Sequence, residues 1–260
     1  MPNIPTFNNF SFNDTNWITQ RIEFKGWADR EVIRGKINRR EGVKLLATEF
    51  GEKKITLEGV VVASGINNLQ LLLDNMKAAV TIEEGSLVLE TGRTYSATVD
   101  SIDIPDEHYS QSKTDFAVTF VCSQPFSIGT LLSVTIPVTS GIFTLSGTVT
   151  ISGSLFARPQ IIYTPPSATG QTLIKRFDIY HVQTGQTTTV SGFGSGTSLN
   201  YQNTVTVNLD NFTTLEGTTL VNTTGGFPRF EPGVNNFTIT ASGRVFPGGS
   251  VSISYQPRYL

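Results

Sequence analysis

The residue types that most often carry catalysis or bind metals are scarce in this sequence. Its 260 residues include one cysteine and two histidines. A single cysteine excludes an internal disulfide framework. His108 and His181 lie far apart in the sequence, which disfavours both a two-histidine metal site and a serine–histidine–aspartate arrangement. We therefore expect no catalytic residue, no metal and no cofactor, and a packed or rim position for His181.

Long apolar runs and a large net charge are also missing. The net charge of −2 gives no broad attraction to nucleic acid or to an anionic membrane. No stretch approaches the apolar length that spans a bilayer. The first residues, MPNIPTFNNFSF, lack the basic start and apolar core of a secretory signal. These features predict a soluble protein without a membrane segment.

Charge is distributed unevenly along the chain. Up to Phe126 there are 13 Lys+Arg and 17 Asp+Glu, whereas the rest of the chain holds 6 and 4 and is rich in Thr, Ser, Asn and Gly. A chain of this length is sufficient for two domains of ordinary size. We therefore predict a first domain over residues 1–126 and a second over residues 127–260.

A strongly patterned strand is expected at the end of the first domain. Phe116, Val118, Phe120 and Cys122 fall at every second position, so a strand places all four on one face. Cys122 is expected to be a buried, inert thiol. Pro125 has no N–H to donate to a sheet, so the strand should end close to it.

One helix is predicted, over residues 66–80. Apolar side chains spaced three or four residues apart form a single stripe, which consists of Ile66, Leu69, Leu73, Met76 and Val80. Either Ser64 or Asn67 is expected to cap the start of the helix. The stripe should pack on the sheet of the first domain.

The rest of the first domain shows mainly strand patterns. Ile55 and Leu57 alternate with polar residues, which is typical of a half-buried strand, and a turn at residues 51–53 should join it to a strand over residues 43–50. The charged run over residues 30–40 is expected to be a solvated loop, with a contact to a neighbour inside a ring as the alternative. Residues 1–20 predict either a strand of the same domain or an arm that reaches a neighbouring subunit.

Beyond residue 126, short apolar–polar alternations are separated by turn dipeptides. They predict strands near residues 143–151, 157–163, 177–182, 204–209, 236–241 and 251–255. Such spacing is typical of a β-sandwich or jelly roll. The predicted fold class is therefore mainly β, with an N-terminal β-barrel or sandwich domain that contains one α-helix, followed by a C-terminal jelly-roll β-sandwich.

The second domain offers few groups for chemistry. Its aromatic candidates for stacking on sugar rings or contacting a partner are Tyr180, Phe193, Tyr201 and Phe212, and core packing is the alternative for each. Its carboxylates are Asp178, Asp210, Glu216 and Glu231. A glycan hydrolase needs a pair of carboxylates, so an enzyme is the least favoured function.

Two stretches of the sequence resemble a known family. The first runs from YSATVDSI through DFAVTFVCSQPF, and the second is FDIYHVQTGQTTTV followed by GGFPRFEPGVNNFTIT and SISYQPRYL. Together with the helix-containing first half, their order resembles the distal tail protein of long, non-contractile-tailed bacteriophages. The resemblance covers nearly the whole chain.

That resemblance implies a structural virion protein at the tail tip or baseplate, made in the cytoplasm of the host bacterium. Such proteins form a homo-hexameric ring that joins the tail tube protein to the tail-tip hub protein. The ring leaves a channel through which DNA passes without specific binding. A galectin-like β-sandwich projects outward, where it carries receptor-binding or side-fibre proteins.

Edge strands of the first domain are the expected ring contacts, because an exposed strand edge pairs readily with another chain. The candidate residues are Val43, Leu45, Ile55, Leu57 and Val61. The alternative function is a lectin-like module that attaches to host cell-surface glycans, and it would use the aromatic candidates of the second domain.

Overall fold

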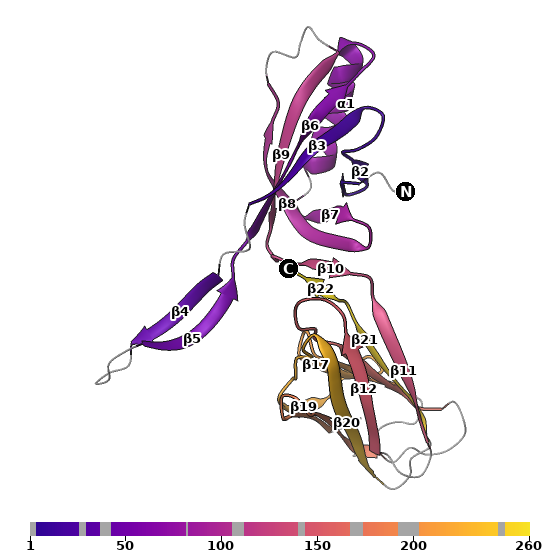
Figure 1. The fold of residues 1–260 in the computed structure, drawn as a ribbon. Coiled ribbons are helices and arrows are strands. Elements are labelled where there is room, and N and C mark those ends of the chain that lie inside the picture. Colours follow the sequence, from indigo (N-terminus) through magenta and orange to yellow (C-terminus); the bar gives the residue numbers. More distant parts are fainter. Residues whose placement is uncertain are drawn as a thin grey trace. The chain divides into compact units, whose positions relative to one another are not determined.

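The chain is mainly β, with one helix among the described residues, as predicted, and it forms two compact units (Figure 1). The computed structural model describes residues 4–25, 30–36, 43–81, 83–105, 112–139, 144–166, 174–191, 203–243 and 248–260, with the backbone alone at residues 25, 30–36, 43–50 and 243. The first unit is Met1–Gly129 together with Leu260, and the second is Thr130–Tyr259. Among the described residues, no helix is long and apolar enough to cross a membrane.

The first unit is built around one antiparallel sheet. Its elements are β1 (Thr6–Phe7), β2 (Phe10–Ser11), β3 (Trp17–Lys25), β4 (Arg30–Lys36), β5 (Val43–Phe50), β6 (Lys53–Val62), α1 (Ile66–Val80), β7 (Gly85–Glu90), β8 (Arg93–Asp103), β9 (Lys113–Cys122) and β10 (Ser127–Gly129). The sheet has the order β2–β1–β7–β8–β9–β6–β3, and β10 also pairs with β8. In this order β3 is an edge strand, whereas β6 lies between β3 and β9.

Strand β9 has the alternation that the sequence predicts. Phe116, Val118, Phe120 and Cys122 are all buried, and the residues between them are half-buried. The strand pairs with β6 along its whole length, from Lys53↔Cys122 to Val62↔Lys113. The face of β9 that carries these four side chains therefore packs against the core of the first unit.

The N-terminal aromatic residues complete this core. Phe7, Phe12 and Trp17 are buried. The ring of Phe7 lies 5.1 Å from that of Phe120, and the ring of Trp17 lies 5.1 Å from that of Phe116. Of the two alternatives for residues 1–20, the structure therefore supports a segment that belongs to its own domain.

Helix α1 spans the predicted residues and packs along the sheet (Figure 1). Its buried residues are Leu69, Leu73, Met76 and Val80, whereas Ile66 is exposed. The predicted cap was wrong. Gly65 occupies the cap position, and no side chain caps the helix. Ser64 lies one residue too early to do so, and its Oγ instead accepts a hydrogen bond of 3.2 Å from Nδ2 of Asn68.

The charged run after β3 is not the loop that we expected. Its first part is β4, which forms a separate two-stranded ladder with β5, from Arg30↔Phe50 to Lys36↔Val43. Strand β5 itself was predicted, but it pairs with β4 and not with β6. Backbone groups make the hydrogen bonds of a ladder, so a charged sequence does not prevent a strand from pairing.

The second unit is a sandwich of two antiparallel sheets, with orders β11–β21–β13–β16–β17–β18 and β12–β20–β14–β15–β19. Its strands are β11 (Leu132–Val138), β12 (Thr144–Ile151), β13 (Gln160–Thr164), β14 (Ile174–His181), β15 (Gln186–Ser191), β16 (Val205–Asn208), β17 (Thr213–Glu216), β18 (Thr219–Leu220), β19 (Asn222–Gly225), β20 (Gly233–Gly243), β21 (Gly249–Tyr255) and β22 (Arg258–Tyr259). Side chains of both sheets, such as Ile161 and Ile253 from one and Ile179 and Ile239 from the other, form a single apolar core.

Candidate functional site

Three of the predicted ring contacts are core residues. Ile55, Leu57 and Val61 have no solvent-exposed surface and belong to the core cluster of the first unit. Their strand, β6, is central and not at an edge. This corrects the expectation for these three side chains, because they would reach another subunit only if the domain opened. Val43 and Leu45 lie in β5, whose side chains are outside the described part of the structure.

One edge of the sheet of the first unit is β3. Ile18 is 44% exposed and Phe24 is 47% exposed on this strand. Between them, Arg21 forms ion pairs with Glu23 at 3.5 Å and with Glu58 at 3.7 Å. An unpaired strand edge with exposed apolar side chains is a template for pairing with another chain.

The predicted aromatic residues of the second unit do not form one site among the described residues. Tyr180 is 41% exposed on β14, and Phe212 is 50% exposed in the turn between β16 and β17. These strands belong to different sheets. Phe193 and Tyr201 lie outside the described residues, as does His108.

The four carboxylates of the second unit are each engaged by another side chain. Oδ2 of Asp178 lies 2.8 Å from Nε of Arg176, and Oδ1 of Asp210 lies 3.0 Å from Nη2 of Arg258. Nδ2 of Asn203 donates to Glu216 at 3.3 Å. Glu231 pairs with Arg229, with 2.8 Å between Oε1 and Nε. This arrangement suits structural ion pairs better than the facing acid and base of a glycosidase.

The described part of the chain provides no candidate metal site. No group of three or more His, Cys, Asp or Glu residues is placed to hold a metal ion there. A small cavity in the sandwich core is lined by Ile161, Tyr163, Phe177, Ile179, Val205, Val207, Ile239 and Val251. The hydroxyl of Tyr163 already donates to the carbonyl of Gly248 at 2.7 Å, so this cavity is a packing gap.

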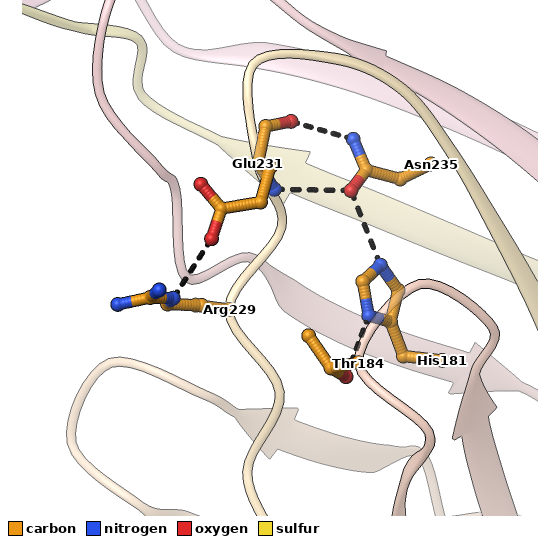
Figure 2. A network of polar contacts seen from close by, with 5 residues as sticks. All are labelled: His181, Thr184, Arg229, Glu231 and Asn235. Atoms are coloured by element: carbon orange, nitrogen blue, oxygen red, sulfur yellow. Dashed lines mark hydrogen bonds and ion pairs between the residues drawn. The ribbon is translucent and has the colours of Figure 1, made fainter.

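His181 is the centre of a buried polar network, which Figure 2 shows. Its Nδ1 lies 2.8 Å from Oγ1 of Thr184, and its Nε2 lies 3.1 Å from Oδ1 of Asn235. Nδ2 of Asn235 donates to the carbonyls of Glu231 and Gly233 at 2.7 and 3.0 Å, and its Oδ1 also accepts from the N–H of Glu231 at 3.0 Å. The network therefore ties the β14–β15 turn to the segment that leads into β20.

The bonding pattern fixes the tautomer of neutral His181. Because the amide nitrogen of Asn235 donates twice, its oxygen must be the acceptor, so Nε2 of His181 carries the proton, and in the neutral ring Nδ1 then accepts from Thr184. His181 is fully buried. Burial lowers its pKa, and this outweighs the opposing effects of the Asn235 hydrogen bond and of Glu231. At neutral pH the imidazole is uncharged and holds Thr184 and Asn235 together by hydrogen bonds. This agrees with the predicted packed position.

Around Phe212 the structure gathers residues that sequence reasoning missed: Phe156, Arg158, Phe227 and Arg229. The guanidinium of Arg158 lies 4.8 Å from the ring centre of Phe212, and Phe227 contacts Phe212 edge-on at 5.3 Å. The available signal was a repeated Phe-x-Arg pattern, in LFARPQ and GGFPRFEP. We call Phe156, Arg158, Phe212, Phe227 and Arg229 the arginine–aromatic cluster.

Comparison with known proteins identifies the fold. No protein-family model matches the chain, and no curated protein matches it in sequence. Among solved structures, the Dit (gp 19.1) protein of phage SPP1 matches with a TM-score of 0.65 and 12% sequence identity, over 94% of this chain and 94% of that chain. That protein is described as a paradigm of the hub adsorption apparatus in phages that infect Gram-positive bacteria. The match confirms the predicted resemblance at the level of fold.

Two structures of the phage P2 baseplate in its activated conformation are also similar. The calcium-bound structure matches with a TM-score of 0.38 and 10% identity, over 91% of this chain and 90% of that chain. The strontium-bound structure matches with a TM-score of 0.39 and 8% identity, over 90% and 88%. The conclusion on the fold rests on the SPP1 protein alone.

Proposed function

We propose that the chain is a structural virion protein, a distal tail hub that joins a phage tail tube to the host-adsorption apparatus. The observation that carries this proposal is the correspondence with the SPP1 Dit fold along nearly the whole of both chains. Because both units contribute to the match, the proposal concerns both units and not one common module. A fold alone does not determine function, so the proposal needs a test of assembly.

The proposed assembly is a homo-hexameric ring with a central channel for DNA. A closed ring requires heterologous contacts, in which one surface of each copy meets a different surface of the next copy. The exposed edge of β3, with Ile18 and Phe24, is the proposed contact, and Val43 and Leu45 of β5 remain candidates. A net charge of −2 agrees with DNA passing through without specific binding.

Light scattering combined with electron microscopy of the purified chain tests the ring. The wild type should have the mass of six copies and give ring-shaped particles. Ile18→Lys places a charge on the β3 edge and should shift the mass to the monomer. Leu71→Lys is the matched control, since Leu71 is 58% exposed and belongs to α1 and not to β3. Monomers in solution, together with no antibody label at the tail tip of virions, would exclude the proposal.

The second unit is proposed to hold receptor-binding or side-fibre proteins at the periphery of the ring. Its sandwich contains few charges, and its exposed arginine and aromatic side chains suit a contact surface. Purification of virions that carry a tagged copy, followed by mild crosslinking, would identify the neighbours. Crosslinks from residues 130–259 to the tail tube protein, and none to an adsorption protein, would contradict this orientation.

Attachment to host glycans is the alternative function, and the exposure of Tyr180 and Phe212 favours it. A glycan array probed with the whole chain distinguishes the two functions. Binding that Tyr180→Ala or Phe212→Ala abolishes would support the lectin. If the chain binds no glycan on the array, the structural function stays the proposal.

A further inference from the structure

The arginine–aromatic cluster belongs to the second unit, for which the proposed function gives contacts with other proteins but no specific site. It is built on three segments that are distant in sequence: the residues before β13, the turn between β16 and β17, and the residues before β20. Its side chains are partly solvent-exposed, although they combine the residue types that are most enriched at protein interfaces.

A short bridge between Ala157 and Phe230 holds two of these segments together. The N–H of each residue donates to the carbonyl of the other at 2.8 Å, and both side chains are buried. Since side chains alternate across an extended chain, the residues on either side of each bridge residue point to the opposite, outer face. Phe156 and Arg158 thus lie beside Arg229 on that face.

The turn that carries Phe212 is fixed by its own hydrogen bonds. Oδ1 of Asn208 accepts from the N–H groups of Asp210 and Asn211 at 2.9 and 3.3 Å, and the N–H of Leu209 donates to the carbonyl of Pro159 at 3.2 Å. Phe212 has a φ of 58°, which is an unfavourable conformation for a bulky residue. The fold therefore holds this ring over Arg158 in spite of a local backbone cost.

Both arginines of the cluster contact its phenyl rings. The guanidinium of Arg158 lies over two rings, at 5.7 Å from the centre of Phe156 and 4.8 Å from that of Phe212. Arg229 is also stacked on Phe156, at 5.1 Å. Such packing orients a guanidinium group before any ligand arrives, and preorganisation favours binding.

Arg158 differs from the other arginines at this place in having no described acidic partner. Arg229 is paired with Glu231, and Arg258 is paired with Asp210. Nε of Arg158 is buried and has no hydrogen-bond acceptor among the described residues. Counting these three arginines and two carboxylates leaves one unbalanced positive charge, and because Nε is buried, a ligand from outside would bind Arg158 through its two Nη atoms.

We propose that Arg158 anchors a docking site for a carboxylate side chain of another protein, with Phe212 packing on the apolar part of the same segment. The planar guanidinium fork matches a carboxylate in two parallel hydrogen bonds. A protein is favoured over a glycan because arginine and aromatic anchors dominate protein interfaces. This proposal does not depend on ring formation.

Phenylacetate is the probe, because it combines a carboxylate with an aromatic ring. It should bind the complete chain saturably in an NMR titration, and the neutral phenylacetamide should not. In Arg158→Gln, phenylacetate affinity should fall about tenfold or more, because a charge-assisted pair is lost. Arg176→Gln is the control, since Arg176 is a surface arginine of the same unit. This variant should bind phenylacetate with the affinity of the wild type.

Phe212→Asn separates the ring from the charge. Asparagine tolerates the left-handed backbone, so the turn should persist while the ring is lost. The wild type should prefer phenylacetate to acetate, and this preference should disappear in the variant. Equal melting temperatures of the variants and the wild type will show that the fold is intact.

Three results would overturn the proposal. Tighter, saturable binding of glucuronate than of phenylacetate would assign the site to acidic glycans instead. A carboxylate affinity that is unchanged in Arg158→Gln would place the binding elsewhere. No saturation by phenylacetate or glucuronate would mean that the cluster is structural only.

Discussion

The ring of His181 is stacked on the ring of Phe230, with 4.5 Å between their centres and 20° between their planes. Phe230 is also the residue that forms the bridge with Ala157. The buried polar network therefore supports the scaffold of the arginine–aromatic cluster from the inside. Substitutions of His181 and Asn235 should each lower the free energy of unfolding of the second unit, and each effect can be measured in its own variant.

The stability of the protein should decrease as the pH falls through about 6.5, the ordinary pKa of histidine. Burial holds the pKa of His181 below that value in the folded chain. The unfolded chain then takes up a proton that the folded chain does not, so this contribution is complete above about pH 6.5 and is lost below it. The loss should be at most about 1.4 kcal/mol per pH unit.

Urea unfolding between about pH 7.5 and 5.5 tests this dependence. His181→Gln should be less stable than the wild type at the upper pH by about 1–3 kcal/mol, because hydrogen bonds of a buried group are lost. Its stability should then change less with pH. An equal pH dependence in the two proteins would show that His181 is not the titrating group.

Asn235→Ala should destabilise the second unit by about 3 kcal/mol, since it leaves several buried donors and acceptors without partners. Asn236→Ala is the matched control, because Asn236 is exposed and should contribute less than about 0.5 kcal/mol. Chemical denaturation of both variants gives the comparison. Similar effects of the two substitutions would contradict the central place of Asn235 in the network.

The thiol of Cys122 should not react in the folded protein. Burial raises its pKa to about 11, against a smaller lowering by the ammonium group of Lys53. Ellman's reagent at about pH 8 should therefore label the chain only after urea is added, because the thiolate is the reactive form. Rapid labelling without urea would indicate that the core of the first unit opens readily.

Gly59→Ala should destabilise the first unit by about 1–3 kcal/mol, as overpacking does. A Cβ at this position would lie 2.2 Å from the carbonyl oxygen of Ile18 and 2.8 Å from the ring of Phe116. Gly65→Ser is the contrasting variant, because a Cβ there meets nothing within 4 Å and serine supplies the missing helix cap. It should raise stability by a few tenths of a kcal/mol.

Thermal unfolding of these two glycine variants provides the measurement. If Gly59→Ala melted at the wild-type temperature, β3 would have to move away from β6 without cost. Such freedom would also argue against a fixed β3 edge as the ring contact.

Elements defined by local periodicity were predictable from the sequence. Helix α1 was found at its full length, and β9 showed its alternation, because burial of one face imposes a regular spacing. Strand β4 was missed because its pairing with β5 needs no apolar spacing. Strand β15, with the sequence QTTTVS, was missed for lack of a clear apolar pattern.

The order of strands in the sheets and the bridges between distant segments could not be predicted from the sequence. The alternation of β6 is the same whether the strand is central or at an edge, so Ile55 and Leu57 were predicted as ring contacts although they are core residues. Phe212 could be chosen from the sequence as a candidate binding residue because it is aromatic. Arg158 could not be chosen, since its environment depends on the bridge between Ala157 and Phe230, which are far apart in the sequence.

The pairing of β11 with β21 determines when the sandwich can form during synthesis. Leu132 pairs with Tyr255, and Val138 pairs with Gly249. The path of strands from β2 to β3 in the first sheet, by contrast, is complete once Cys122 has been made. On the ribosome, the first unit can therefore fold while β11 is still an apolar segment without its pairing partner, because β21 has not yet been synthesised. Host chaperones that bind such segments would act on this part of the nascent chain, and would be released when β21 emerges.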